Sequence, residues 1–364
     1  MFNTLAICFI TSLVATLFVL RYVHKHSRLL DSDVSGVQKF HKHPVPRVGG
    51  VSVYFAFLVG AIFSYFTKKN IGIDCLLLGL SASFAFGGGV LEDITKDVSP
   101  RRRLLLTTIS AIAAYFLLDA AVVRLGWAGL DNMLPALWLS LPITIFAVAG
   151  VTNAINIIDG FNGLASVVVM FMLVSVTYVA FEVADPFIIQ ACLITIGAIA
   201  GFFVWNYPRG LIFLGDGGAY FIGVILAELV VLLVARNPQV SPWYAMLLLI
   251  YPVFETFFSI YRKKFLRKMS PSMPDGVHLH MLIFKRMVRW AVGSADAKHI
   301  KHRNALTSPY LWVLSLMAVL PATIWWHNQW VLCIFTLLFI VFYITVYWKI
   351  VRFKTPKWLI IKKH

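Results

Sequence analysis

The chain has 364 residues, of which 60% are hydrophobic and only 13% are charged, and its mean hydropathy is +0.81. Soluble domains are closer to half apolar and a quarter charged, so this composition excludes an ordinary soluble domain. Apolar runs near the ~20 residues needed to cross a bilayer recur along the whole length, which predicts an all-α polytopic membrane protein. The net charge of +16 could suit nucleic acid, but its distribution indicates membrane topology and no nucleic-acid partner.

We expect about eleven membrane-spanning helices in a single integral-membrane domain over residues 1-364. The expected spans cover residues 3–21, 48–66, 72–91, 104–123, 137–153, 164–181, 187–206, 217–235, 242–261, 309–327 and 330–348. The first run has no basic residues before it and no small-residue cleavage site after it, which favours a retained span over a signal peptide. The four cysteines lie far apart inside apolar runs, so we predict no disulfide.

The basic residues lie almost entirely on one side of these spans. Only Lys68, Lys69, Arg124 and Arg236 fall on the opposite side, which leaves 28 of the 32 lysines and arginines on the first side. By the positive-inside rule the basic side is cytoplasmic, so we expect the N-terminus outside and the C-terminus in the cytoplasm. The basic segments include a large loop over residues 262-308 and a tail over residues 349-364, which could also bind anionic membrane lipids or phosphate.

The first polar cluster closes the third expected span at its cytoplasmic end. Glu92 and Asp93 lie there, although the C-terminus of a helix carries partial negative charge and disfavours acids. We therefore expect these acids to bind a metal, accept a proton or form an ion pair. Arg103 follows ten residues after Asp93 as the last of three consecutive arginines, of which Arg101 and Arg102 are more simply explained as topology anchors.

The most informative stretch covers residues 151–164, between two long apolar runs. It carries Asn153, Asn156, Asp159 and Asn162, one at every third position, and helical spacing would keep them on neighbouring positions of one face. Two glycines then end the helix and let a ligand approach the backbone. Polar groups beside hydrocarbon are costly and are usually functional. The alternative is a short cytoplasmic loop with an Asn-rich turn.

Asp216 lies between glycines at the start of the eighth expected span. An acid is favourable at the N-terminus of a helix, and the free backbone N–H groups there can bind phosphate oxygens. The simpler alternative is that Asp216 only caps this helix, and the residue alone leaves both explanations open.

The long basic loop carries His278 and His280, followed by Arg286. Zinc would need further ligands, for which only His299 and His302 lie near in the sequence. A phosphate site needs several donors and no metal-ligand set, which suits these residues better. The alternative is a solvated basic loop.

The expected topology brings these clusters together, so we predict an active site on the cytoplasmic face. They supply carboxylate and amide oxygens for Mg²⁺, which typically takes one or two carboxylates plus substrate phosphates, and basic groups for the phosphates. No serine or cysteine is placed as a covalent nucleophile. This chemistry is most consistent with phosphoryl transfer, and a site in the membrane implies a lipid substrate.

The ordered motifs resemble those of the polyprenyl-phosphate N-acetylhexosamine-1-phosphate transferases, which are of the glycosyltransferase family 4 type. The motifs are Pro46-Arg-Val-Gly-Gly50, Glu92-Asp93 with Arg103, Asn153-x-x-Asn156-x-x-Asp159-Gly-x-x-Gly163-Leu164, Gly215-Asp216-x-Gly218 and His278-x-His280. The resemblance runs from about residue 40 to residue 290. It implies an enzyme of the bacterial inner (cytoplasmic) membrane that transfers a sugar 1-phosphate from a UDP-N-acetylhexosamine to undecaprenyl phosphate and releases UMP.

The resemblance also implies roles for individual residues. Asp216 and Asn156 would bind Mg²⁺, with Mn²⁺ as the alternative ion, and Asp93 would deprotonate or position the lipid phosphate. The implied catalytic residues are Asp93, Glu92, Asp159 and His280, and the implied substrate-binding residues are Arg103, Asn153, Gly160, Asn162, Phe213, His278 and Arg286. Arg103 and the two histidines would hold pyrophosphate oxygens. Asp159, Gly160 and Asn162 would line a uridine pocket, where Phe213 would stack on uracil unless it is a lipid-facing anchor.

Two departures from the family pattern affect these expectations. Glu92 replaces the first acid of the usual Asp-Asp pair, which makes Asp93 the stronger candidate and leaves the role of Glu92 open. Met281 stands where many relatives carry another histidine, and the triple-histidine signature of the muramyl-pentapeptide branch is missing. We therefore expect an enzyme that starts an O-antigen (lipopolysaccharide), capsule or teichoic-type polymer rather than peptidoglycan.

A transporter of a lipid-linked or nucleotide sugar is the main alternative function. Transporters place polar residues near the bilayer midplane, often in paired repeats, whereas these clusters lie at the ends of spans and no repeat is visible. A scaffold that binds anionic lipid would explain the basic loops but not Asn156, Asp159 and Asp216. The sequence leaves open which sugar is used and whether the lipid-facing helices form a homodimer.

Overall fold

The protein is described here by a computed structural model, which covers residues 2–23, 30–31, 45–134, 136–266, 268, 276–288 and 297–352. These residues are almost entirely helical, as the composition predicts. Apart from loops, the described residues also include a short antiparallel pairing of β1 (Leu30–Asp31) with β2 (Val45–Pro46). All four cysteines are free thiols, as expected.

The helices are named in chain order. They are α1 (Phe2–Val23), α2 (Gly49–Thr67), α3 (Lys69–Thr95), α4 (Pro100–Leu118), α5 (Ala128–Asp131), α6 (Leu137–Ile158), α7 (Leu164–Glu182), α8 (Pro186–Asn206), α9 (Gly215–Arg236), α10 (Pro242–Leu248), α11 (Ile250–Tyr261), the π-helix η2 (Arg262–Leu266), α12 (Leu279–Leu282), the π-helix η3 (Ile283–Val288), α14 (Ala297–Ile324) and α15 (Gln329–Val351).

The chain is a multi-pass membrane protein, but the expected eleven spans are not all present. Within the described ranges, nine helices are long and apolar enough to cross a membrane. A tenth span is present if α10 and the continuous segment of α11 and η2, which are bent by 68° relative to each other, cross the membrane together. The remaining expected span, 104–123, is not among them. Its helix, α4, begins with Pro100 and three arginines and ends at Leu118, because Asp119 has a left-handed backbone with φ of 55°. The apolar part of α4 is therefore shorter than the sequence suggested.

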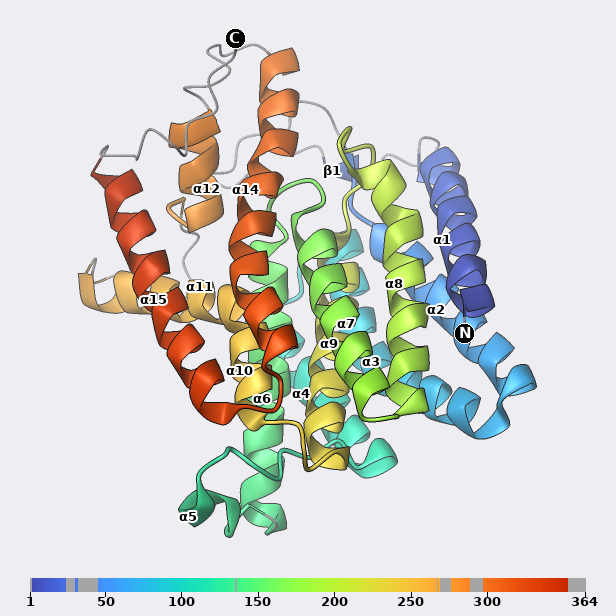
Figure 1. The fold of residues 1–364 in the computed structure, drawn as a ribbon. Coiled ribbons are helices and arrows are strands. Elements are labelled where there is room, and N and C mark those ends of the chain that lie inside the picture. Colours follow the sequence, from blue (N-terminus) through green and yellow to red (C-terminus); the bar gives the residue numbers. More distant parts are fainter. Residues whose placement is uncertain are drawn as a thin grey trace.

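Figure 1 shows most helices running side by side, with α11 lying across them. The turns that follow α6 and α8 lie at the same end of the bundle as α12, which is the upper end in Figure 1. Segments that are far apart in the sequence therefore meet at one end of the molecule. The start of α1 lies toward the opposite end, and α15 finishes at the upper end.

Helix α9 forms the centre of the bundle. It is apolar on all sides, and nearly every residue from Gly215 to Val234 is buried, which is typical of a helix surrounded by other helices. At its N-terminus α2 and α3 approach it backbone to backbone. A Cβ on Gly89 of α3 would lie 2.5 Å from the backbone of Gly217, and a Cβ on Gly50 of α2 would overlap Gly218. These glycines allow the N-terminus of α9 to lie directly against α3.

Candidate functional site

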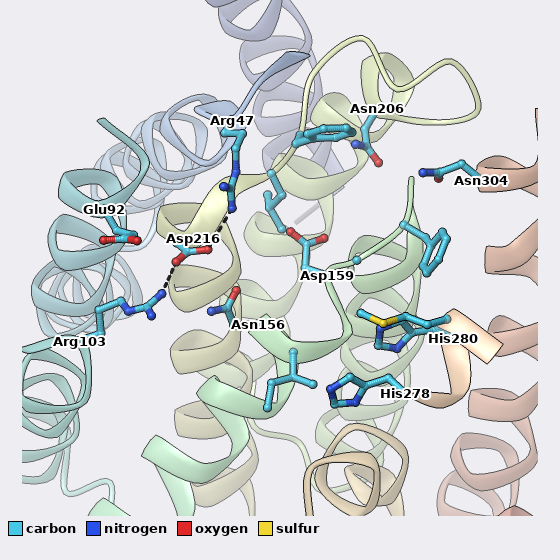
Figure 2. Close-up of a pocket in the computed structure, with 17 residues that line it drawn as sticks. Arg47, Glu92, Arg103, Asn156, Asp159, Asn206, Asp216, His278, His280 and Asn304 are labelled. Carbon is cyan, nitrogen blue, oxygen red and sulfur yellow. Dashed lines mark hydrogen bonds and ion pairs between the residues drawn. The ribbon is translucent and has the colours of Figure 1, made fainter. Parts of the chain in front are cut away.

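A pocket of about 430 Å³ lies at the end of the bundle where these turns meet (Figure 2). Its wall combines acidic, amide and basic side chains. The lining residues are Arg47, Glu92, Arg103, Asn156, Ile157, Asp159, Gly160, Phe161, Asn206, Phe213, Leu214, Gly215, Asp216, His278, His280, Met281 and Asn304. Each of the four polar clusters from the sequence contributes to this wall, so the structure brings them together as expected.

Asp216 makes the two ion pairs drawn in Figure 2. One carboxylate oxygen lies 2.5 Å from Nη1 of Arg103 on α4, and the other lies 3.5 Å from Nη2 of Arg47, which follows β2. The N-cap of α9 is Leu214, so Asp216 lies inside the first turn and does not cap the helix. Two cations from distant parts of the chain therefore neutralise this acid.

Backbone hydrogen bonds hold Arg47 in this position. The N–H of Phe213 donates to the carbonyl of Pro46 at 2.8 Å, and the N–H of Gly49 donates to the carbonyl of Phe213 at 3.0 Å. The segment before α2 is thereby paired with the segment before α9. Gly215 has a φ of 76°, and a Cβ at this position would overlap the carbonyl of Arg47, so the close approach requires glycine.

The two acids at the end of α3 have different environments. Asp93 is buried, and its two carboxylate oxygens accept the N–H groups of Asp216 and Gly217, each at 2.9 Å. These N–H groups are in the first turn of α9 and have no acceptor within that helix. Glu92 instead lines the pocket, and its Oε2 accepts the N–H of Val98 at 2.7 Å. Of these two acids, Glu92 therefore lies on the pocket wall, whereas the sequence made Asp93 the stronger candidate for a catalytic role.

Asn156 and Asp159 reach the pocket from the end of α6. The helix ends at Ile158, and Asp159 is its C-cap residue. Burial raises the pKa of Asp159 well above its usual range, and the nearby negative charge of Asp216 raises it further. A cation or a hydrogen-bond donor in the pocket would favour the ionised form of this carboxyl group. The protonation state of Asp159 therefore depends on what binds beside it.

Three other expected site residues do not line the pocket. Asn153 donates to the carbonyl of Ala149 within its own helix at 2.8 Å. The side chain of Asn162 donates to the carbonyl of Pro208 at 3.2 Å. Arg286 donates to carbonyls at the end of α15. In this structure these side chains support the surrounding backbone rather than the pocket wall.

His278 and His280 lie on the pocket wall with parallel rings, 5.3 Å between centroids and 2° between planes. His278 Nδ1 lies 2.9 Å from Oε1 of Glu255 on α11. His280 is fully buried, and among the described residues neither of its ring nitrogens has a hydrogen-bond partner. Burial, with the neighbouring charge of His278, lowers the pKa of His280 to about 3, so this ring is neutral near pH 7.

Four residues of the site were not among the candidates named from the sequence. Arg47 lay within the motif over residues 46–50, so that segment carried a signal, whereas Asn206 was only the last residue of an expected span. Asn304 on α14 accepts the N–H of Asn162 at 2.9 Å, and Glu255 contacts His278 from α11. The last two have no local pattern, because each acts on a residue far away in the sequence.

The oxygen atoms of this pocket can coordinate a divalent cation only if a bound substrate supplies further ligands. Among the residues that the structure describes, no group of three or more His, Cys, Asp or Glu side chains could hold a metal ion. Asp216, Asp159 and Asn156 nevertheless supply oxygen atoms to one pocket. Mg²⁺ commonly uses one or two carboxylates and completes its coordination with substrate phosphates and water. The residues present therefore fit Mg²⁺ bound together with a phosphorylated ligand.

Comparison with known proteins shows which class of proteins this membrane protein is similar to. Residues 75–234 match the family described as Glycosyl transferase family 4. This part of the chain is therefore similar to that family, in agreement with the family resemblance read from the motifs and with the expectation of a membrane-bound transferase.

Relatives extend the similarity over most of the chain. The chain is 25% identical over 357 residues to the "Probable undecaprenyl-phosphate N-acetylglucosaminyl 1-phosphate transferase" of Bacillus subtilis, and the aligned region covers 95% of this chain and 91% of the relative. It is 27% identical over 279 residues to the "Undecaprenyl-phosphate alpha-N-acetylglucosaminyl 1-phosphate transferase" of Thermotoga maritima, covering 75% and 78%. It is also 26% identical over 314 residues to the "Phospho-N-acetylmuramoyl-pentapeptide-transferase" of Streptococcus uberis, covering 79% and 90%. These bacterial relatives represent two kinds of transferase.

Proposed function

We propose that the protein transfers an N-acetylhexosamine 1-phosphate from a UDP-sugar to undecaprenyl phosphate and releases UMP. The observation that carries this proposal is the charge arrangement around Asp216, which pairs with Arg47 and Arg103 beside Glu92. A pyrophosphate bound with a divalent cation needs both kinds of charge at one place, because the cation requires oxygen ligands and the phosphates require basic donors. The names of the B. subtilis and T. maritima relatives support N-acetylglucosamine as the sugar.

In this proposal Asp216 and Asn156 hold Mg²⁺, or Mn²⁺, together with the phosphates of the UDP-sugar. When bound, the cation would neutralise negative charge that develops on the phosphates during transfer. Arg47 and Arg103 already lie within reach of the same carboxylate, so both are placed to donate to phosphate oxygens that enter the pocket. His278 adds a third basic donor on the opposite wall (Figure 2).

The transfer itself needs no covalent intermediate with the protein. A phosphate oxygen of undecaprenyl phosphate attacks the phosphorus that carries the sugar, and the bond from that phosphorus to the oxygen of UMP breaks. A phosphate dianion is nucleophilic near neutral pH, so positioning and charge neutralisation supply most of the catalysis. We assign the positioning of the lipid phosphate, or acceptance of its proton, to Glu92 on the pocket wall, and we assign Asp93 to holding the first turn of α9.

The remaining wall residues would bind the uridine. Asp159, Gly160 and Phe213 line the same pocket, and Asn206 is fixed nearby because its Oδ1 accepts the N–H of Gly163 at 2.6 Å. An aromatic ring such as Phe213 can stack on a planar base. Asn162 would contribute only through the backbone that it supports.

The orientation in the membrane is part of the same proposal. The expected basic side carries the pocket, so the pocket would open to the cytoplasm of a bacterial cell, where UDP-sugars are found. The expected polymer is an O-antigen, capsule or teichoic-type polysaccharide, because the chain lacks the triple-histidine signature of the muramyl-pentapeptide branch.

A panel of donors tests this function. The purified protein is incubated with undecaprenyl phosphate, Mg²⁺ and one of UDP-N-acetylglucosamine, UDP-N-acetylgalactosamine or UDP-N-acetylmuramoyl-pentapeptide, and UMP is measured. We expect UMP with a UDP-N-acetylhexosamine, and only when lipid and metal are both present. UMP from the muramoyl donor alone would place the protein in the other branch. A donor that binds but yields no UMP would support the transporter alternative.

A further inference from the structure

Glu255 is a fully buried carboxylate behind the pocket wall, and both of its oxygens are occupied. Oε1 lies 2.9 Å from Nδ1 of His278 and accepts the N–H of Leu279 at 3.2 Å. Oε2 accepts the hydroxyl of Tyr343 on α15 at 2.5 Å. Glu255 is 0% exposed and does not line the pocket, so it acts on a ligand only through the groups that it binds.

This contact determines which nitrogen of His278 carries a proton. A carboxylate is only an acceptor, so the ring nitrogen facing it must carry a hydrogen to form the bond. Nδ1 of His278 is therefore protonated whether the ring is neutral or charged. The ring is also fixed in orientation, which leaves Nε2 as the nitrogen available to the pocket.

His280 provides a direct contrast within the same motif. Its ring is stacked against His278, but in the part of the chain that the structure describes neither of its nitrogens has a hydrogen-bond partner and no acid is bound to it. Two histidines on one pocket wall are therefore held differently, and within the described ranges only His278 is bound to an acid from outside the pocket. Such a buried carboxylate–histidine pair is the usual arrangement for fixing the tautomer of a functional histidine.

We propose that Glu255 is a positioning residue that fixes the tautomer and the orientation of His278, and that Tyr343 holds Glu255 in place for this task. The proposal rests on the proposed function in one respect, namely that His278 binds the phosphates of the UDP-sugar. It adds that the last described helix, α15, takes part in the site through a hydroxyl group that does not touch the ligand.

The first test reads the tautomer directly and needs no substrate. Protein labelled with ¹⁵N in its histidine rings is studied by NMR at pH 8.5, and the signal of His278 is assigned from its loss in His278→Ala. We expect a protonated Nδ1 on His278 in the wild type and a protonated Nε2, or a mixture, in Glu255→Leu. An unchanged His278 signal in folded Glu255→Leu would overturn the proposal.

A matched control is available in Glu228 of α9, another fully buried glutamate, whose Oε2 accepts the hydroxyl of Ser81 at 2.8 Å. Glu228→Gln should leave the His278 signal unchanged. If Glu255→Leu does not fold, Tyr343→Phe takes its place, because it removes only one hydrogen bond to Glu255 and preserves the ring. It should shift the same signal partway in the same direction, and no shift would count against the proposal.

The second test asks whether Glu255 acts through His278. The affinity for UDP, which carries the two phosphates of every UDP-sugar, is measured by calorimetry with Mg²⁺. Glu255→Leu should weaken UDP binding about 10–100-fold, the range seen for residues that orient functional histidines. In a His278→Ala background the same change should have less than about a 3-fold effect, because the positioned group is gone.

Equal losses in both backgrounds would show a general structural role and overturn the proposal. Failure of the sugar assignment would leave both tests intact, since neither uses a sugar or the lipid. If the wild type does not bind UDP, the proposed function is refuted. The tautomer measurement would still decide the role of Glu255.

Discussion

Asp93→Asn separates the roles of the two acids at the end of α3. Asp93 accepts two N–H groups from the first turn of α9, each at 2.9 Å. Hydrogen bonds to a charged group contribute about 1.5–3 kcal/mol each, and asparagine keeps one acceptor oxygen. The cost of burying the charged Asp93 carboxylate, together with its repulsion by Asp216, offsets part of the loss. We therefore expect the free energy of unfolding to fall by about 1.5–2 kcal/mol, toward the lower end of that range.

Glu92→Gln is the matched comparison, because glutamine keeps an oxygen for the N–H of Val98. Its unfolding free energy should stay within about 0.5 kcal/mol of the wild type. Its rate of UMP release should fall at least about 100-fold, since the proposal places the carboxylate of Glu92 beside the lipid phosphate. Asp93→Asn should retain more activity than Glu92→Gln at temperatures where it is folded.

The assay combines thermal unfolding in detergent with UMP release under saturating substrates. The opposite pattern would refute this division of roles. If Asp93→Asn keeps the unfolding midpoint of the wild type but loses turnover, while Glu92→Gln remains active, Asp93 is the residue that acts on the lipid phosphate.

Three further predictions concern single residues. Asp216→Asn should abolish Mg²⁺-dependent UMP release in a protein that remains folded, and near-normal Mg²⁺-dependent activity would contradict the metal assignment. Phe213→Ala should raise the KM for the UDP-sugar about 5–30-fold through loss of stacking, with the KM for the lipid unchanged as the control; an unchanged donor KM would exclude stacking. The pKa of His280 is about 3 in the fold and about 6.5 when unfolded, so its contribution to stability is complete above pH 6.5 and is lost as the pH falls toward 3. The free energy of unfolding of the wild type should fall between pH 7 and pH 5, and in His280→Gln this fall should be smaller by about 2 kcal/mol, as measured by denaturant titration. A fall of the same size in both proteins would show that another group is responsible.

The clustering of the site was predictable because it follows from topology. Polar residues such as Asn156, Asp159 and Asp216 interrupt long apolar runs at the ends of spans, and spans of similar length bring their ends to two common levels. Because the motifs lie at span ends on the same side of the membrane in the expected topology, they could be expected to form one site. The structure places all three residues on one pocket wall.

That Glu92 lines the pocket while Asp93 contacts the first turn of α9 could not be predicted in the same way. Consecutive residues of a helix point in directions about 100° apart, so only one of them can face a given neighbour. Which one does so depends on how α3 packs against α9, and this packing is determined by glycine contacts such as Gly89 with Gly217. The spacing of residues in the sequence does not show how far α3 is rotated about its own axis relative to α9.

Glu255 and Asn304 were missed for a different reason. Each contacts a residue that is distant in sequence, namely His278 and Asn162, and neither lies in a motif of its own. The end of α4 was also misplaced, because a left-handed residue at Asp119 stops the helix without glycine or proline. Apolar composition beyond that point therefore suggested a longer span than the backbone forms.

Transfer of the sugar-bearing phosphate itself is the most direct test of the central claim. UDP-N-acetylglucosamine carrying ³²P only at the phosphate attached to the sugar is incubated with the protein, undecaprenyl phosphate and Mg²⁺, and lipid and nucleotide are separated. The account predicts that the label appears in the lipid fraction and that the released UMP carries none. Label that remains in released UDP would show transfer of the sugar without its phosphate and would contradict the account.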